Sequence, residues 1–82
     1  MKLIDQSIEL IAWFDTEGIP HPVRFRYNGS VIRIQQITQM MEEGYDRSRR
    51  KVFRCQSEVL GRVRVFELKF EYSSCKWVLW KM

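Results

Sequence analysis

Arginine and lysine gather in two parts of the sequence, and their guanidinium and ammonium groups are suited to binding phosphate or carboxylate. One set alternates with apolar residues in a predicted strand hairpin, and the other forms a short run beside a tyrosine. If both sets share one surface, the cations can contact phosphates while the tyrosine stacks on a base. The sequence therefore predicts a nucleic-acid site. Its predicted residues are Arg24, Arg26, Arg33, Tyr45, Arg47, Arg49, Arg50 and Lys51.

Each set of cations also has an ordinary interpretation. The run from Arg47 to Lys51 follows closely after Glu42, Glu43 and Asp46, and a short stretch of mixed charge is usually a solvated surface. For this run we favour the ordinary interpretation. For the three arginines of the hairpin, the functional and the ordinary interpretations are evenly balanced.

Catalytic and metal-binding patterns are weak. His21 lies between Pro20 and Pro22 without an identifiable nucleophile or carboxylate partner, so an exposed turn histidine is favoured over a general base. Cys55 and Cys75 lack the spacing and histidine partners of a zinc site. We expect Cys55 to be buried and inert and Cys75, near a turn, to be more reactive. The sequence predicts no enzyme, no catalytic residue, no metal and no cofactor.

The length of 82 residues, with 45% apolar and 29% charged residues, excludes a multidomain enzyme, a disordered polymer and a membrane-spanning helix. We expect one domain over residues 1–82. The net charge is +4, and the excess of positive charge follows Glu42. The first residues lack the pattern of a signal peptide, so we expect a cytoplasmic protein without a membrane partner.

Strands must position these side chains, because apolar and polar residues alternate through most of the chain. A first strand is predicted over residues 8–14. The strands 23–27 and 30–34 flank Asn28-Gly29, which suits a two-residue type I′ turn. This turn places Phe25 opposite Ile32 on an apolar face and leaves the three arginines of the hairpin on the other face.

Two further hairpins follow. Taking Leu60-Gly61 as the loop of the second places Cys55 opposite Phe66, Phe53 opposite Leu68 and Arg54 opposite Glu67. Leucine is a poor first residue for a type I′ turn, so a bulged turn is an equal alternative. The third hairpin turns at Ser73-Ser74 and pairs Phe70 with Trp77. Residues 39–51 are expected to form a long loop, and residues 37–43 could form one helical turn before Gly44.

The predicted fold class is all-β: a small antiparallel barrel-like or strongly twisted sheet of five to six strands built from consecutive hairpins. Each strand also has apolar residues on its second face. The exposed members of that face could bind a protein partner or form a homodimer, which makes assembly the alternative to binding RNA or single-stranded DNA. The residues of this alternative are Trp13, Val65, Val78 and Trp80.

Four strings of residues resemble a family of small bacterial proteins that are known as domains of unknown function. They are Pro22-Val23-Arg24-Phe25-Arg26-Tyr27, Val52-Phe53-Arg54-Cys55, Phe66-Glu67-Leu68-Lys69-Phe70 and Trp77-Val78-Leu79. Their order resembles that of the family over roughly two-thirds of the chain. The resemblance implies a β fold and a bacterial cytosolic setting, and it implies no activity.

Overall fold

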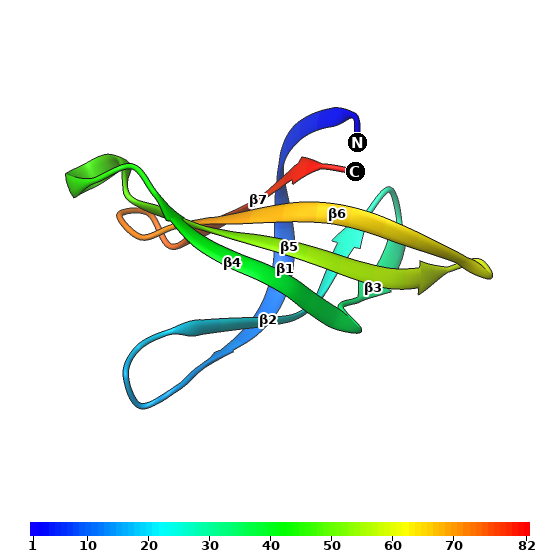
Figure 1. Cartoon of the computed structure of the whole chain (residues 1–82), viewed down its shortest axis with the longest axis horizontal. Coiled ribbons are helices and arrows are strands. Elements are labelled where there is room, and N and C mark those ends of the chain that lie inside the picture. Colours follow the sequence, from blue (N-terminus) through cyan, green and yellow to red (C-terminus); the bar gives the residue numbers. More distant parts are fainter.

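The computed structural model describes residues 1–82 and consists of strands joined by short turns (Figure 1). No helix in it is long and apolar enough to cross a membrane. The elements in chain order are β1 (Leu3–Phe14), β2 (Pro20–Tyr27), β3 (Ser30–Arg33), β4 (Gln36–Glu43), the 3-10 helix η1 (Asp46–Ser48), β5 (Arg50–Val59), β6 (Arg62–Glu71) and β7 (Lys76–Lys81).

All seven strands belong to one antiparallel sheet in the order β3-β2-β1-β7-β6-β5-β4. The first and last strands are neighbours, so the two chain ends meet. The amide of Lys2 donates to the carbonyl of Met82 at 2.8 Å, and the amide of Met82 donates back at 2.9 Å. This long-range pairing joins the β1–β2–β3 hairpins to the β4–β7 meander.

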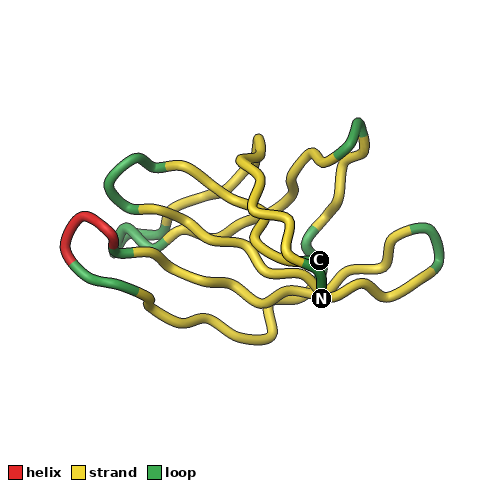
Figure 2. The backbone as a smooth tube through the Cα atoms, turned by 90° about the horizontal axis from the view of Figure 1, so that it is seen from above, coloured by secondary structure: helices red, strands yellow, loops and turns green.

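The structure confirms an all-β antiparallel fold but corrects its details. There are seven strands rather than five or six, and no ladder joins β3 to β4, so the sheet does not close into a barrel. It curves around a shared interior, as the view from above shows (Figure 2). Gln35, between β3 and β4, connects across the gap to β5. The backbone amide of Gln35 donates to Ser57 Oγ at 3.1 Å, and its side-chain oxygen accepts from the backbone amide of Glu58 at 2.9 Å.

The long loop and the helical turn predicted around residues 37–51 are wrong. Residues 37–43 belong to strand β4 and residues 50–51 to β5, so only Gly44–Arg49 remains as a connection with the short helix η1. A bulge at Thr38 interrupts the pairing of β4 with β5, and Thr38 Oγ1 donates to the Arg54 carbonyl at 3.1 Å. Pairing with β5 satisfies the backbone groups on one side of β4, which overrides the helical preference of its methionine and glutamate side chains.

The predicted registers of the three hairpins are confirmed. Phe25 pairs with Ile32, Cys55 with Phe66, and Phe70 with Trp77. The inward members of these pairs form one core, and Phe25 packs edge-on against Phe66 with 5.3 Å between ring centroids. The buried core residues are Phe25, Ile32, Phe53, Cys55, Phe66, Leu68, Phe70, Trp77 and Leu79.

The turn between β5 and β6 is a two-residue turn rather than a bulged one, because Val59 pairs directly with Arg62. Leu60 has a φ of 52° and Gly61 a φ of 77°. Leucine is unfavourable in this left-handed region, and its side chain is 99% exposed, so no packing offsets the cost. The register is therefore held by the strands and not by the turn sequence.

Replacing Leu60 with Asn should stabilise the protein by about 1 kcal/mol, because Asn tolerates the left-handed conformation of a type I′ turn. Urea unfolding of Leu60→Asn and of the control Leu60→Ala measures the effect. The alanine control, which keeps the unfavourable conformation and gives up almost no buried surface, should remain close to the wild type. An asparagine variant no more stable than the alanine variant would contradict this explanation of the turn.

Candidate functional site

The arginine face consists of Arg24, Arg26 and Arg33 on the outer side of β2 and β3. Asn28 and Gly29 have φ values of 49° and 76°, which form the tight turn between the two strands. Since Phe25 and Ile32 point into the core, the residues that alternate with them point outward. The outward placement predicted for these arginines follows from this register.

Two arginines of this face are placed directly opposite each other. Arg24 on β2 pairs with Arg33 on β3, and neither forms an ion pair. Arg26 differs, because its guanidinium lies 3.6 Å from the carboxylate of Glu9 on β1. Like charges at directly opposed positions of two strands are destabilising. The Arg24–Arg33 pair thus places two positive charges next to each other with no acidic side chain to balance them.

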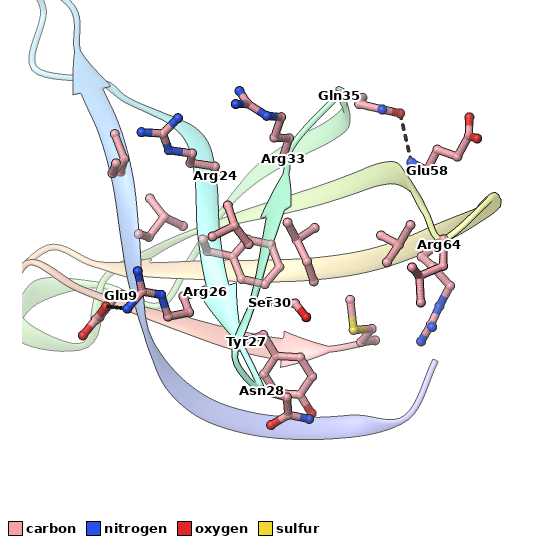
Figure 3. A pocket seen from close by; sticks show the side chains of 18 residues that line it. Glu9, Arg24, Arg26, Tyr27, Asn28, Ser30, Arg33, Gln35, Glu58 and Arg64 are labelled. Atoms are coloured by element: carbon pink, nitrogen blue, oxygen red, sulfur yellow. Dashed lines mark hydrogen bonds and ion pairs between the residues drawn. The ribbon is translucent and has the colours of Figure 1, made fainter.

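The arginine face lines one side of a groove of about 1130 Å³, between the β2–β3 hairpin and the end of the β5–β6 hairpin. Arg64, from β6, also lines it, so the lining contains four arginines and two glutamates, Glu9 and Glu58. Figure 3 shows Arg24 and Arg33 side by side at one part of the groove and Arg64 at another. The groove therefore has a net positive lining with cations spread along it.

Trp13 and His21 form a stacked pair beside the arginine face. They occupy opposed positions on β1 and β2, with 3.9 Å between ring centroids and 7° between ring planes. His21 Nε2 lies 2.9 Å from Asp15 Oδ2. Asp15 also accepts hydrogen bonds from the amides of Ile19 and Glu17. The bond with His21, followed by that from Ile19, holds the pKa of Asp15 below its usual value.

This pair differs from the exposed turn histidine predicted from the sequence, because His21 belongs to β2 and is half-buried. A bulge explains its position. Pro22 and Arg24 pair with consecutive residues of β1, so Val23 is an extra residue in β2. His21 and Arg24 consequently share the outer face although they are three residues apart. Strict alternation would separate them, and Pro22 beside the bulge is the one sequence signal for it.

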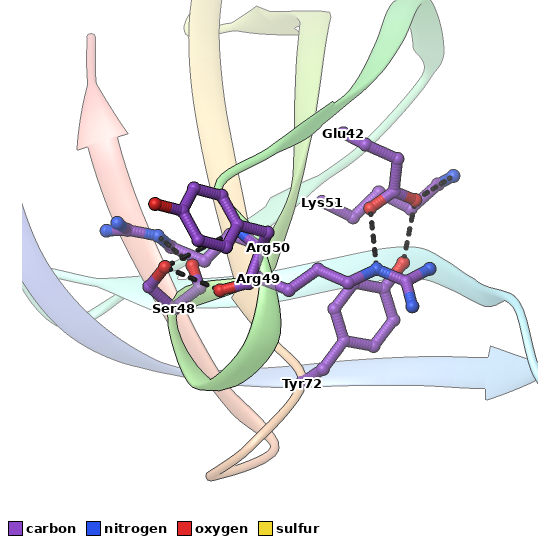
Figure 4. A network of polar contacts seen from close by, with 7 residues as sticks. Glu42, Ser48, Arg49, Arg50, Lys51 and Tyr72 are labelled. Carbon is purple, nitrogen blue, oxygen red and sulfur yellow. Dashed lines mark hydrogen bonds and ion pairs between the residues drawn. The ribbon is translucent and has the colours of Figure 1, made fainter.

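Two of the basic residues near η1, Arg49 and Lys51, contact the carboxylate of Glu42 (Figure 4). Arg49 Nε and Lys51 Nζ each lie 3.4 Å from it, and the Tyr72 hydroxyl donates to it at 3.0 Å. The Arg49 guanidinium also lies over the Tyr72 ring, 4.6 Å from its centroid. Two of the four predicted loop cations therefore share one glutamate as their ion-pair partner.

The remaining predicted loop residues have no carboxylate partner. Arg50 Nε donates to the Ser48 carbonyl at 3.1 Å, while Arg47 forms no ion pair, and the Tyr45 side chain is 78% exposed. None of these residues lines the groove, and η1 lies at the opposite end of the molecule from β3 (Figure 1). The structure does not bring the two sets of cations together around the groove.

The second apolar face contains a charged residue that the sequence interpretation missed. Lys69 on β6 is buried, with its Nζ 2.9 Å from Glu43 Oε2 and 3.8 Å from the ring centroid of Trp80. Trp80 and Val78 are half-buried, so part of each apolar side chain is accessible to a partner. Lys69, on the strand between β7 and β5, interrupts the apolar surface that they form. Self-assembly through this face stays a prediction, and the face is less apolar than the sequence suggests.

The cysteines occupy the environments that the sequence predicts. Cys55 is buried in the core, which raises the pKa of its thiol to about 12, whereas Cys75 is exposed in the turn before β7. Both are free thiols. No group of three or more histidine, cysteine or acidic side chains is arranged to hold a metal ion.

Glu42 should contribute to stability in a pH-dependent manner. Partial burial opposes its ionisation, but the hydrogen bonds from Tyr72, Arg49 and Lys51 outweigh burial and lower its pKa below 4.5. A carboxyl group whose pKa is lower in the folded state stabilises that state at pH values above its unfolded-state pKa. This contribution is lost as the pH falls through the folded-state pKa.

Glu42→Gln should therefore lower the free energy of unfolding by about 1 kcal/mol or less at neutral pH, since the network is largely solvent-exposed. The difference from the wild type should shrink as the pH is lowered through the folded-state pKa of Glu42. Urea titrations over a pH series measure it, with Glu17→Gln, which forms no ion pair, as the control. A difference that does not change with pH would show that the charge of Glu42 is unimportant.

Comparison of the chain with protein-family models, with curated proteins and with solved structures gave no match.

Proposed function

We propose that this protein is a non-enzymatic module that binds nucleic acid, with the arginine face contacting the phosphate backbone. The observation that carries the proposal is the direct opposition of Arg24 and Arg33 without a carboxylate partner. Opposed like charges cost up to about 1 kcal/mol in a sheet. A phosphate between the two guanidinium groups would replace this repulsion with charge-assisted hydrogen bonds.

The rest of the groove supports an extended anion rather than a single small one. Arg26 is held by Glu9 only in an exposed ion pair, which is worth little and can exchange for a phosphate. Arg64 continues the positive lining away from Arg24 and Arg33. A polyanion with regularly spaced phosphates can engage these sites together, and counterion release would then contribute to its affinity.

The basic loop near η1 has a secondary role in this proposal. Arg49 and Lys51 already contact Glu42, so a phosphate would have to displace that carboxylate. Arg47 and Arg50 have no acidic partner, and the exposed ring of Tyr45 can stack on a base. These three residues can contact a long ligand that extends beyond the groove.

Self-assembly is a second candidate function, favoured by the open edge of β4. This eight-residue strand ends the sheet, and Met40 and Met41 on it are exposed. An unpaired edge can add a strand from another chain. The bulge at Thr38 and the two glutamates that end β4, Glu42 and Glu43, protect this edge against pairing with another chain. We therefore rank assembly second. Sedimentation over a concentration series distinguishes a stable dimer from a monomer.

A bacterial cytoplasmic setting and the resemblance to the bacterial family belong to the same proposal. Both agree with a small basic β protein, and neither specifies an activity.

The double variant Arg24→Ala/Arg33→Ala should bind a labelled oligonucleotide about tenfold more weakly than the wild type, since each arginine forms charge-assisted hydrogen bonds with a phosphate. The plot of log K against log salt should become shallower by about 0.7 for each phosphate of a single strand that the variant no longer neutralises. Anisotropy titrations at several salt concentrations measure both quantities.

Arg49→Ala/Lys51→Ala is the matched control, because it removes the same charge from residues that already form ion pairs with Glu42. This control should lose less affinity and less salt dependence than the Arg24/Arg33 variant. Absence of wild-type binding at low ionic strength, or equal losses in the two double variants, would refute the arginine face as the binding site.

A further inference from the structure

We infer that the stacked pair of Trp13 and His21 extends the arginine face into a base-stacking site, so that the ligand is single-stranded nucleic acid. This inference rests on the proposed function, and it specifies which form of nucleic acid is bound. Its basis is the placement of an exposed, rigidly held aromatic ring on the same surface as the unpaired arginines.

Trp13 is the tryptophan best placed to contact a ligand. Trp77 belongs to the buried core, and Lys69 lies over the ring of Trp80 at 3.8 Å from its centroid. Trp13 is 55% exposed, although large aromatic side chains usually dominate cores and interfaces. One face of its ring rests on His21, so an added base would extend an existing stack of two rings.

The pair is held in place before any ligand binds. His21 Nε2 lies 2.9 Å from Asp15 Oδ2, and the same carboxylate accepts the Ile19 and Glu17 amides at 2.9 Å each. This fixes the turn that follows β1 and the ring of His21, which in turn supports the Trp13 ring. A preorganised ring loses little conformational entropy when a base stacks on it.

The spacing suits one strand of nucleic acid. Trp13 lies two residues along β1 from Ile11, which pairs with Arg24 on β2, and Arg24 pairs with Arg33 on β3. With about 3.4 Å per residue and about 4.8 Å between strands, the Cα of Trp13 lies about 8 Å from that of Arg24 and about 12 Å from that of Arg33. One strand can therefore place a base on Trp13 while its phosphates contact the two arginines.

A duplex cannot use this arrangement, because its bases are already paired and stacked inside the helix. It can contact only the arginines, through its phosphates. Stacking on an aromatic ring tolerates every base, since each base has a π face. The structure therefore predicts a preference for single strands over duplexes and little dependence on base sequence.

The test compares single-stranded oligo(dT) and oligo(U) with a DNA duplex of the same length, using Trp13→Ala and Trp13→Phe. Trp13→Ala should weaken single-strand binding about 5- to 100-fold, the loss expected for one stacked base. Trp13→Phe should recover most of this loss, because it restores an aromatic ring. Binding of the duplex should be unchanged in both variants. Circular dichroism checks that each variant keeps the β fold.

Tryptophan fluorescence gives an independent readout. Oligo(dT) should quench the emission of the wild type and of Trp80→Phe, but it should quench much less in Trp13→Phe. Inorganic polyphosphate, which has phosphates and no bases, should bind more weakly than oligo(dT) of similar charge. Equal binding of polyphosphate and oligo(dT) would overturn the stacking site.

The two proposals fail in different ways. If Trp13→Ala binds single strands as tightly as the wild type while Arg24→Ala/Arg33→Ala binds weakly, the stacking site is wrong and the arginine face stands. If the arginine variant binds oligonucleotides as the wild type does, the proposed function itself is wrong. Tighter binding of an acidic protein than of any oligonucleotide would also overturn the assignment of a nucleic-acid ligand.

Discussion

The pairing of Phe25 with Ile32 across the Asn28-Gly29 turn is the constraint on which the arrangement of this protein depends. Both side chains are buried, and Phe25 packs edge-on against Phe66 of β6, which attaches the β2–β3 hairpin to the core. A slip of one residue would expose the pair and bury Arg24 and Arg33 instead. The cost of burying two unpaired guanidinium groups makes that alternative inaccessible, so the hydrophobic core itself fixes the arginines on the outer surface.

The open sheet determines where a ligand can bind. Pairing of β1 with β7 joins the two halves of the chain, and the sheet curves until Gln35 reaches Ser57 and Glu58 on β5. The sheet stops short of closure at β3 and β4, and the groove lies beside the β3 edge. The arginine face and the stacked Trp13–His21 pair both belong to the three strands on that side. The Glu42 network stabilises the opposite end of the molecule.

Local signals in the sequence predict the three hairpins, because alternation and turn residues act over only a few positions. They do not predict β4, whose strand form depends on pairing with β5, or the pairing of β1 with β7 at the two ends of the chain. The outward placement of Arg24 and Arg33 follows from alternation, but the bulge at Val23 that brings His21 to the same face does not. Likewise, the contact between Glu42 and Tyr72 joins residues 30 positions apart, so the sequence shows the charges near Glu42 but not the tyrosine that completes their network.

Mapping of amide and side-chain NMR shifts during titration with a short oligo(dT) tests the central claim most directly. We expect the largest changes at the side chains of Arg24 and Arg33 and at the Trp13 indole, with smaller changes near η1. Changes concentrated between Tyr45 and Lys51, or along the open edge of β4, would contradict the assignment of the arginine face as the binding surface. The absence of any change at low ionic strength would contradict the proposed function altogether.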